Sequence, residues 1–500
     1  MHASDGVAVP VRSAAGLEGA LPDVDRVIVD LTARAYDGVV AIARVRAAGT
    51  PVLAVGQHDD AELRRRALAA GADRVHTYRQ LFEDGPRQMS RWLAVEDRHD
   101  RHARRDGVAT MITSRPSIPA ERYRERISAA QARAAEAGLS AILVGVGADL
   151  RYLTGYPAMP LERLTMLVIP ASGAPSLVAP RLEATPARAC PPAAAGYLPV
   201  VTWEEADDAH ALVASMVRAA LDEPRGRALR VAVSDDLPAR HLLRLRDHLA
   251  EAKLELASPV LRELRIVKDA DEIALLTEAA HAADRVVAQI AGGSLVGRTE
   301  ADVAREVRER LIAEGHDDAH FAIVGSGPNS ASPHHEASER VITAGEPIVL
   351  DIGGTIDGYG SDITRTLWVT GGDPAKGPDE RFRHLFAVLH GAQEAATRAV
   401  RPGVTPEAVD AAARDPITAE GFGDAFFHRT GHGIGLEGHE DPYIIAGNHE
   451  PLGEGMAFSI EPGIYLIDEY GARIEDIVVC GPDGPIALNE AARELYVVDG

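Results

Sequence analysis

Cysteine is scarce in this sequence: only Cys190 and Cys480 occur in 500 residues, and they lie far apart. Two distant cysteines cannot build a disulfide framework of the kind that small secreted proteins need. We interpret both as small buried apolar residues and expect the protein in the reducing cytoplasm. The first residues, MHASDGVAVP, also lack the basic and apolar regions of a secretion signal.

Long apolar runs and positive charge are lacking as well. No apolar run approaches the roughly 18 to 20 residues that a membrane-spanning helix needs, so we expect no membrane association. The formal net charge of −23 at pH 7 disfavours nucleic acid as a partner, because an acidic protein repels a phosphate backbone. Arginine greatly outnumbers lysine, which occurs only at Lys253, Lys268 and Lys376, and we interpret this as compositional bias.

The chain is long enough for two or three domains. Residues 1–85 alternate short β-rich runs with Ala- and Arg-rich helical patterns, which predicts a small parallel α/β unit. Residues 86–117 are rich in arginine, histidine and aspartate, which is typical of a polar, solvated linker. Residues 118–262 begin with an amphipathic helix that ends at Gly138, continue with a strand at 141–144, and predict a second α/β domain.

Residues 263–500 have a different pattern. Two helical segments come first, at 271–292 and 299–314, and strands punctuated by glycine follow. We expect these strands at 321–326, 347–352, 361–369, 456–466 and 472–480. Helices followed by an antiparallel set of strands predict an α+β fold for this region.

A candidate metal centre lies in this region, and its first part is a pair of aspartates. The dipeptide Asp357-Gly358 is a strong signal for a two-residue hairpin turn. A turn there pairs residue 351 with residue 364, so that Asp351 and Asp362 lie on one face of the hairpin. Diagonal neighbours of this kind sit roughly 7–8 Å apart. Carboxylates that converge from this separation can share metal ions about 3.5–4 Å apart.

A pair of glutamates forms the second part of the candidate centre. The segments around Glu461 and Glu475 predict another hairpin, in which Gly471 provides the positive-φ position of a three-residue loop. An odd loop places residues an even number apart on the same face, and positions 461 and 475 satisfy this condition. A glutamate in the apolar context AFSIEPGIY is costly to bury unless a metal or a salt bridge compensates it. Pro462 argues against a central, regularly paired strand position.

Histidines lie between and before these acidic pairs. His428, His432 and His439 occur in one short stretch, and His334 follows a Gly-rich segment upstream. Glycines on both sides of His432 allow its imidazole to approach a crowded site without a backbone clash. Each histidine taken alone is more often structural, but several histidines beside four carboxylates indicate a metal centre.

The motifs around these residues resemble those of a known family. In residues 263–500 they are DxGG with YGSDITRT, HRTGHGIGL, HEDP, SIEPGIY and RIED, and they resemble the pita-bread metallopeptidases, which include prolidase, aminopeptidase P and methionine aminopeptidase. In residues 118–262, YRERI, DLRYLTGY and ERLTMLVIP resemble the creatinase-type N-terminal domain of the prolidase and aminopeptidase P branch. The whole pattern is similar to that of the short bacterial Xaa-Pro dipeptidases.

The resemblance implies five metal ligands, and the sequence has all five: Asp351, Asp362, His432, Glu461 and Glu475. Asp362 and Glu475 would bridge two divalent metal ions, Asp351 would bind one of them, and His432 with Glu461 the other. We expect Mn²⁺, with Co²⁺, Zn²⁺ and Fe²⁺ as alternatives that suit the same ligands. The metals would lower the pKa of a bridging water and polarise the scissile carbonyl.

The resemblance also implies roles for residues around the metals. Glu461 would be the general base, and His334 and His439 would steady the tetrahedral intermediate and transfer protons. His428 would line or support the site. Arg473 would either compensate the charge of the carboxylates or contact the substrate directly.

Two hydroxyl residues and one acidic residue complete the candidate site. Thr364 and Ser459 each lie two residues from a ligand on the same strand, so we expect them to orient the ligand carboxylates. Glu437 precedes His439 at a place where relatives often have apolar residues, and this departure is expected to alter the shape of the substrate site.

The implied reaction is hydrolysis of the peptide bond that precedes proline, with Xaa-Pro dipeptides as the expected substrates. An aminopeptidase that acts on longer Xaa-Pro peptides is the alternative, because loops rather than ligands set the substrate length. A metal-free binding module or a creatinase-like hydrolase also uses this fold, but the intact ligand set argues against both. Relatives with this N-terminal domain are commonly dimers, so we expect a homodimer.

Residues 20–85 resemble the later half of a response-regulator receiver domain, which has a flavodoxin-like α/β fold. Its phospho-acceptor would fall on Asp30, but Gly56 stands where a threonine or serine is usual, and Arg79 stands near the expected lysine. Mg²⁺ and phosphate would lack their usual support. We therefore expect a truncated docking or dimerisation module rather than a phosphorylated switch, with a flavodoxin-like unit of other origin as the alternative.

Overall fold

A computed structural model describes residues 115–219 and 229–500, together with parts of the first 77 residues: 27–30, 38–47, 50, 52–56, 66–67, 70, 72 and 74–77. The chain divides into two compact units, Met1–Ile112 and Thr113–Gly500. Arg79, most of the helical pattern at 60–71 and nearly all of the expected linker at 86–117 lie outside the described residues. Of the described helices, none is both long and apolar enough to span a membrane.

The first unit contains a small parallel sheet, as the alternation of its sequence predicts. Strands β1 (Val27–Asp30), β2 (Val52–Gly56) and β3 (Arg74–Thr77) are parallel and lie in that order, with helix α2 (Gly38–Ala47) between β1 and β2 in the chain. The unit has its own apolar core, formed by Val29, Ile42, Val45 and Val52 with neighbouring alanines. Asp30 and Gly56 are the last residues of adjacent strands.

The second unit begins with a six-stranded domain, which we define as α6 to β9 together with α12. Its sheet has the order β7-β6-β5-β4-β8-β9, in which β5 is antiparallel to β4 and β6 and the other pairs are parallel. Helices α6, α7, α8 and α12 pack on one face, and α10 and α11 pack on the other. The strands are β4 (Ala141–Val144), β5 (Met166–Pro170), β6 (Ser176–Pro180), β7 (Val200–Trp203), β8 (Leu229–Val233) and β9 (Ala252–Leu256). The helices are α6 (Ala120–Glu136), α7 (Ala148–Thr154), α8 (Ala184–Ala189), α9 (Pro191–Ala194), α10 (Ala209–Ala219), α11 (Ala239–His248) and α12 (Ser258–Arg265).

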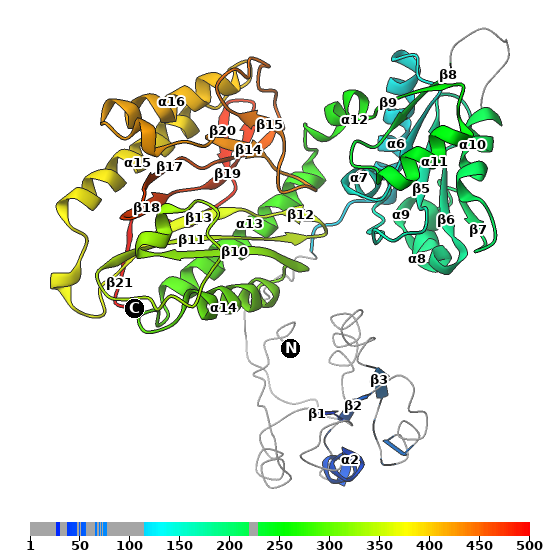
Figure 1. Ribbon diagram of the computed structural model, residues 1–500. Helices are drawn as coiled ribbons and strands as arrows, with labels where there is room; N and C mark the ends of the chain where they lie inside the picture. The colour runs from blue at the N-terminus through cyan, green and yellow to red at the C-terminus, as the bar shows by residue number, and fades with distance from the viewer. Residues whose placement is uncertain are drawn as a thin grey trace, which may run out of the picture. The chain divides into compact units, whose positions relative to one another are not determined.

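The C-terminal domain runs from α13 to β21 and contains two larger sheets (Figure 1). The first sheet has the order β10-β11-β13-β21, and the second has the order β15-β14-β16-β19-β20. The first sheet's strands are β10 (Asp318–Ser326), β11 (Glu346–Ile356), β12 (Tyr359–Gly360), β13 (Ile363–Val369) and β21 (Tyr496–Val498). The remaining strands are β14 (Gly431–Gly433), β15 (Glu440–Ile444), β16 (Ala457–Ile460), β17 (Gly463–Leu466), β18 (Tyr470–Arg473), β19 (Asp476–Gly481) and β20 (Gly484–Ala487).

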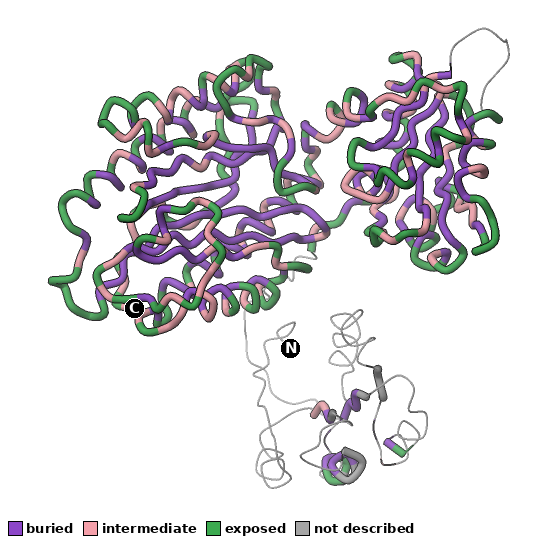
Figure 2. Tube along the Cα trace, in the orientation of Figure 1, coloured by how far each residue is buried: buried purple, intermediate pink, exposed green. Residues whose placement is uncertain are grey.

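Each of these sheets is covered by its own pair of helices. Helices α13 (Ala270–Ala291) and α14 (Glu300–Ala313) pack on the first sheet, and α15 (Glu380–Ala399) and α16 (Pro406–Ala419) pack on the second. The inner strands β11, β13, β16 and β19 are buried along nearly their whole length, whereas the edge strands β20 and β21 are largely not buried. The outer helix faces are exposed (Figure 2). The helices and the mainly antiparallel strands confirm the predicted α+β class.

The first predicted hairpin is confirmed in register. Asp351 pairs with Thr364, and Ile356 pairs with Tyr359 across the Asp357-Gly358 turn. Both turn residues have positive φ angles, 49° and 83°, as this type of turn requires. Asp351 and Asp362 therefore lie two residues apart in register on the same hairpin.

The second hairpin consists of two paired segments with one shared register. Ile460 pairs with Asp476 in β16 and β19, and Gly463 pairs with Arg473 in β17 and β18. Regular pairing stops between these segments, as Pro462 predicts, and there Glu461 lies opposite Glu475 and Pro462 opposite Ile474. Glu461 and Glu475 thus lie directly opposite each other in the register of this hairpin.

The loop of this hairpin corrects the role predicted for Gly471. The loop is residues 467–469, and the residue with positive φ is Asp468, at 65°. Aspartate tolerates this conformation, so the turn does not need a glycine. Gly471 instead lies in β18, where a Cβ atom would collide with the carbonyl oxygen of Ser330 in the 3₁₀ helix η3 (Gly327–Ala331).

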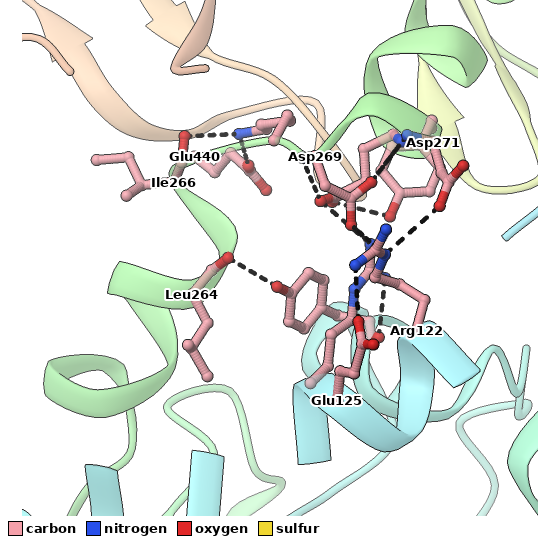
Figure 3. Close-up of polar contacts among 12 residues, drawn as sticks. Arg122, Glu125, Leu264, Ile266, Asp269, Asp271 and Glu440 are labelled. Atoms are coloured by element: carbon pink, nitrogen blue, oxygen red, sulfur yellow. Dashed lines mark hydrogen bonds and ion pairs between the residues drawn. The ribbon is translucent and has the colours of Figure 1, made fainter. Parts of the chain in front are cut away.

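A polar seam joins the six-stranded domain to the C-terminal domain (Figure 3). Arg126 of α6 is 4% exposed and contacts Asp269 at 2.9 Å and Glu272 at 3.1 Å, at the start of α13. Arg122, one turn earlier, approaches Asp269 and Asp271. Asp269 and Glu272 also form the capping box of α13, so these contacts fix the start of the first helix of the C-terminal domain.

Candidate metal centre

The two sheets of the C-terminal domain bring the five candidate ligands together. Asp351 lies in β11, Asp362 directly before β13, and His432 in β14. Glu461 and Glu475 lie at the interruption of the second hairpin. Asp362, His432 and Glu475 each offer a ligand atom within 4.8 Å of the other two.

The contacts of His432 suit a bound cation. Its Nδ1 lies 3.1 Å from the carbonyl oxygen of Gly433, which only accepts, so Nδ1 carries the proton and Nε2 carries a lone pair. Nε2 lies 3.3 Å from an oxygen of Glu461 and 3.7 Å from an oxygen of Asp362. Burial, together with the nearby His439, lowers the pKa of His432 to about 3, so the ring is neutral. The lone pair of Nε2 thus faces carboxyl oxygens, an arrangement that either a bound cation or a proton on one carboxyl satisfies.

Two carboxylates have a free oxygen. Asp351 accepts a hydrogen bond from Arg473 through Oδ2, but its buried Oδ1 has no partner. Glu475 accepts one from the hydroxyl of Thr364 through Oε2 at 2.7 Å, but its buried Oε1 has no partner. A buried carboxylate oxygen without a partner costs free energy unless a ligand satisfies it. Both residues therefore fit the role of metal ligands.

The electrostatics of three of the carboxylates agree with this. Burial and the neighbouring carboxylates Asp351 and Glu461 raise the pKa of Asp362 well above its usual value. Burial and the repulsion of Asp362 do the same for Glu475. Burial raises the pKa of Glu461 to about 7. Divalent cations would compensate this charge, and oxygen and imidazole donors suit Mn²⁺, Co²⁺, Fe²⁺ and Zn²⁺.

The two hydroxyl residues orient ligands in different ways. Ser459 donates to Glu461 at 3.2 Å, so it orients the ligand on its own strand, as the sequence predicts. Thr364 reaches across to Glu475 instead of Asp362, because the isolated bridge between Thr364 and Glu475 brings the two hairpins together there.

Arg473 is fully engaged by protein groups. Its side chain is 2% exposed, and it donates to Asp351, to the hydroxyl of Thr364 at 3.1 Å and to the hydroxyl of Tyr465 at 2.8 Å. A further bond reaches the carbonyl oxygen of Pro333 at 3.1 Å. Of the two roles expected for Arg473, these contacts favour charge compensation.

Tyr465 is a site residue to which the sequence assigned no role. Its hydroxyl accepts from Arg473 and lies 3.0 Å from Nε2 of His428, while Nδ1 of His428 lies 2.7 Å from the carbonyl oxygen of Arg429. Burial and the charge of Arg473 lower the pKa of His428 to about 4. The neutral His428 therefore accepts from Tyr465, and a chain of hydrogen bonds fixes Arg473 from behind.

His439 and His334 lie around the centre. The ring centroid of His439 is 3.9 Å from that of His432. Nδ1 of His439 lies 3.3 Å from a guanidinium nitrogen of Arg429, which only donates, so Nε2 carries the proton. Burial, Arg429 and then His334 lower the pKa of His439. His334 is exposed, and it also contributes to the lowered pKa of His428.

Glu300 is a second residue that the sequence did not indicate. It is the first residue of α14 and is fully buried, and it accepts hydrogen bonds from Ser326, Asn329, His335 and Ser338. These residues belong to the segment that carries His334. An acidic residue at the start of a helix usually only complements the helix dipole, so no local signal marks this function.

The fold and the centre together define a class of protein: an α+β enzyme domain with a buried carboxylate and imidazole site for divalent cations, preceded by an α/β domain. The chain belongs to metallopeptidase family M24. The model of that family matches residues 274–482, and the model of the creatinase/prolidase N-terminal domain matches residues 126–267. The chain is thus a metal-dependent peptidase with the pita-bread fold.

Individual relatives agree with this assignment. A probable dipeptidase PepE of Mycobacterium tuberculosis is 47% identical over 76% of this chain and 97% of its own length. An Xaa-Pro dipeptidase of Lactobacillus helveticus is 34% identical over 70% of this chain and 92% of its own length. The crystal structure of dipeptidase PepE from Mycobacterium ulcerans is 46% identical and has a TM-score of 0.70, over 76% of this chain and 99% of that chain.

Proposed function

We propose that this protein hydrolyses the peptide bond before proline in Xaa-Pro dipeptides, with two divalent metal ions held by Asp351, Asp362, His432, Glu461 and Glu475. One observation carries the metal part of this proposal: the unprotonated Nε2 of His432 faces the carboxylates of Asp362 and Glu461. The substrate part is supported by the names of the relatives, a dipeptidase and an Xaa-Pro dipeptidase.

The metals, when bound, supply a water of lowered pKa and polarise the scissile carbonyl. Glu461, held by Ser459, takes the proton of the attacking water. His439 donates from Nε2 to the oxygen that becomes negative in the transition state. His334, which is exposed, transfers a proton to the leaving proline nitrogen.

Arg473 and His428 act through other residues in this proposal. Arg473 compensates the charge of Asp351, and His428 holds Arg473 through Tyr465. Both keep the ligand set in its shape without contacting the water.

We further propose Mn²⁺ as the native metal, a homodimer as the active assembly, and the cytoplasm as its location. Carboxylates and one imidazole suit Mn²⁺, and Cys190 and Cys480 are both buried and free, as in a reducing compartment. Metal analysis of the purified protein and light scattering test the first two statements separately.

The deciding experiment compares Ala-Pro with Ala-Pro-Pro-Ala as substrates. The metal-free protein is reconstituted in turn with Mn²⁺, Co²⁺, Zn²⁺ and Fe²⁺, and release of free amino acids is followed. We expect turnover of Ala-Pro with Mn²⁺ and slow or no cleavage of the tetrapeptide. Faster cleavage of the tetrapeptide would make the protein an Xaa-Pro aminopeptidase, and no turnover of either with any metal would remove the proposal.

A matched pair of variants tests the centre itself. H432A removes the imidazole ligand and should abolish both metal binding and activity. The matched control is H320A. His320 is exposed and lies in β10, which is the neighbour of β11 on the side away from β13. H320A should retain metal binding and activity.

A further inference from the structure

The segment that carries His439 is held from outside the centre by helix α12. Arg265, the last residue of α12, donates from Nη2 to Glu437 at 2.6 Å and to Glu440 at 2.5 Å. Its Nη1 donates to Asp149, at the start of α7 in the six-stranded domain, at 2.7 Å. The guanidinium is 13% exposed and thus joins three carboxylates in a largely buried position.

A second cation completes the hold on Glu440. Lys268 is 1% exposed, and its Nζ donates to the other oxygen of Glu440 at 2.6 Å, a contact drawn beside Glu440 in Figure 3. Burial alone would raise the pKa of Glu440, but the charges of Lys268 and Arg265 outweigh burial and lower it. Glu440 therefore remains a carboxylate, with each oxygen bound by one cation.

Apolar packing ties the same segment to both domains. Leu436 packs against the core of the six-stranded domain, which includes Val260 and Leu261 of α12. It also packs against a core cluster of the C-terminal domain that includes Ile434. The segment from Leu436 to Glu440 therefore lies where the two domains meet.

His439 lies within this held segment. Its neighbours Glu437 and Glu440 are both bound by Arg265, and its ring lies 3.9 Å from the ring of His432. Arg429 fixes Nδ1 of the ring, but it lies on the other side of β14 in the chain and does not hold the segment's backbone. The backbone around the ring is also paired, because Glu440 pairs with Gly433 and Glu437 accepts a hydrogen bond from the N–H of Gly435. The carboxylates of Glu437 and Glu440 add a link from this segment to α12.

We propose that Arg265 is a positioning residue for the peptidase reaction: through Glu437 and Glu440 it holds His439 against the metal centre, and through Asp149 it ties that position to the six-stranded domain. This inference rests on the proposed function, in which His439 donates to the developing oxyanion. An interaction made mainly in the transition state contributes to kcat more than to KM. Loss of Arg265 should therefore lower kcat while KM changes little.

Variants of the full-length, Mn²⁺-loaded protein test this. R265M removes all three contacts, and R265K keeps a cation that cannot bridge three carboxylates. We expect R265M to lower kcat by roughly 10- to 100-fold, as loss of a supporting contact commonly does, with KM within about threefold. R265K should recover part of the loss. The control is E263Q, because Glu263 lies on the same helix, is 55% exposed and pairs with Arg133 away from the segment; it should behave as the unchanged protein.

A double-mutant cycle separates positioning from general structure. If Arg265 acts through His439, R265M should cost little in a chain that already carries H439A. Full additivity of the two losses, or loss of bound Mn²⁺ in R265M, would overturn the proposal. If R265M does not fold, E437Q removes the more exposed contact only and should lower kcat several-fold; unchanged kcat in both E437Q and R265K would also overturn it.

Hydrogen exchange provides a measurement that does not depend on the substrate. Amides of residues 434–444 should exchange faster in R265M than in E263Q, because the segment keeps its strand pairing but loses its side-chain anchor to α12. If the unchanged protein cleaves no Xaa-Pro peptide, the proposed function fails, while faster exchange still supports the anchoring role. If the unchanged protein cleaves Xaa-Pro peptides but R265M exchanges no faster than E263Q, the anchoring role of Arg265 is refuted while the proposed function stands.

Discussion

Asp351 and Glu475 are each held on one carboxylate oxygen and left free on the other. Arg473 holds Asp351, and Thr364 holds Glu475. One held oxygen restricts the rotamer of the side chain, while the other oxygen stays free to bind a ligand. A ligand that is positioned in this way needs little reordering when a metal binds.

Thr364 provides a prediction at this scale. T364V keeps the shape of the side chain but removes the hydroxyl that donates to Glu475 and accepts from Arg473. We expect metal affinity to fall by roughly 10- to 100-fold, measured by titration of the metal-free protein. T366V is the matched control, because Thr366 is buried on the same strand and bonds only the backbone of Arg473. If T366V weakens metal binding as much, the hydroxyl of Thr364 has no special role.

The two hairpins were predictable because local rules set their geometry. Asp357-Gly358 fixes the register of the first hairpin, and the odd loop fixes the parity of the second, so facing pairs followed from the sequence. The prediction that Gly471 provides the positive φ angle of the second turn was wrong, because Asp468 provides it. Aspartate and glycine both adopt positive φ angles, and the sequence has both near this turn. The register of the hairpins was therefore more predictable than the residue that forms the turn.

The supports of the catalytic segments were not predictable from the sequence. Glu300 lies 35 residues from His335, and Arg265 lies 172 residues from Glu437. No periodicity or turn signal relates residues so far apart, and both look like ordinary charges at helix ends. The motifs indicate candidate residues for the chemistry, whereas tertiary packing decides which residues hold them.

Glu300 provides a prediction at the scale of an element, because it holds the segment after β10 to the start of α14. Burial alone would raise its pKa, but hydrogen bonds from Ser338, His335 and Ser326 lower it from 4.5 to about 2. Its folded-state pKa is depressed, so its stabilising effect is present above about pH 5 and is lost as pH falls toward 2. A shift of this size corresponds to on the order of 3 kcal/mol at neutral pH.

E300Q should therefore destabilise the protein most at neutral pH. Urea unfolding from pH 7 down to pH 3 should show that the difference between the unchanged protein and E300Q becomes smaller as pH falls. E309Q is the control, because Glu309 is exposed on the same helix, and its effect should stay within about 0.5 kcal/mol. A difference for E300Q that does not depend on pH would contradict the role of its charge.

At the scale of the whole molecule, the two compact units have separate apolar cores. The described core of Met1–Ile112 includes Ile42 and Val45, and the cores of Thr113–Gly500 contain residues of that unit alone. Both family matches lie within the second unit. The second unit therefore contains every candidate residue for the peptidase reaction.

A shortened chain that begins at Thr113 should keep its activity. We expect kcat/KM within about twofold of the full-length value and an unchanged unfolding temperature of the peptidase unit, because domains with their own cores fold alone. Activity assays and calorimetry check this, and light scattering shows whether assembly depends on residues 1–112. A large loss of activity or a change in assembly would support the docking or dimerisation role expected for the first unit.

The three lysines give the protein a built-in chemical probe. Lys253 and Lys376 are exposed, whereas Lys268 is 1% exposed and bound to Glu440, which follows His439 in the chain. An amine-reactive reagent should therefore label the first two quickly and Lys268 hardly at all. Because arginine supplies nearly all other positive charge, few side chains compete for the reagent. The modification rate of Lys268, measured by mass spectrometry, thus reports how often its contact with Glu440 opens.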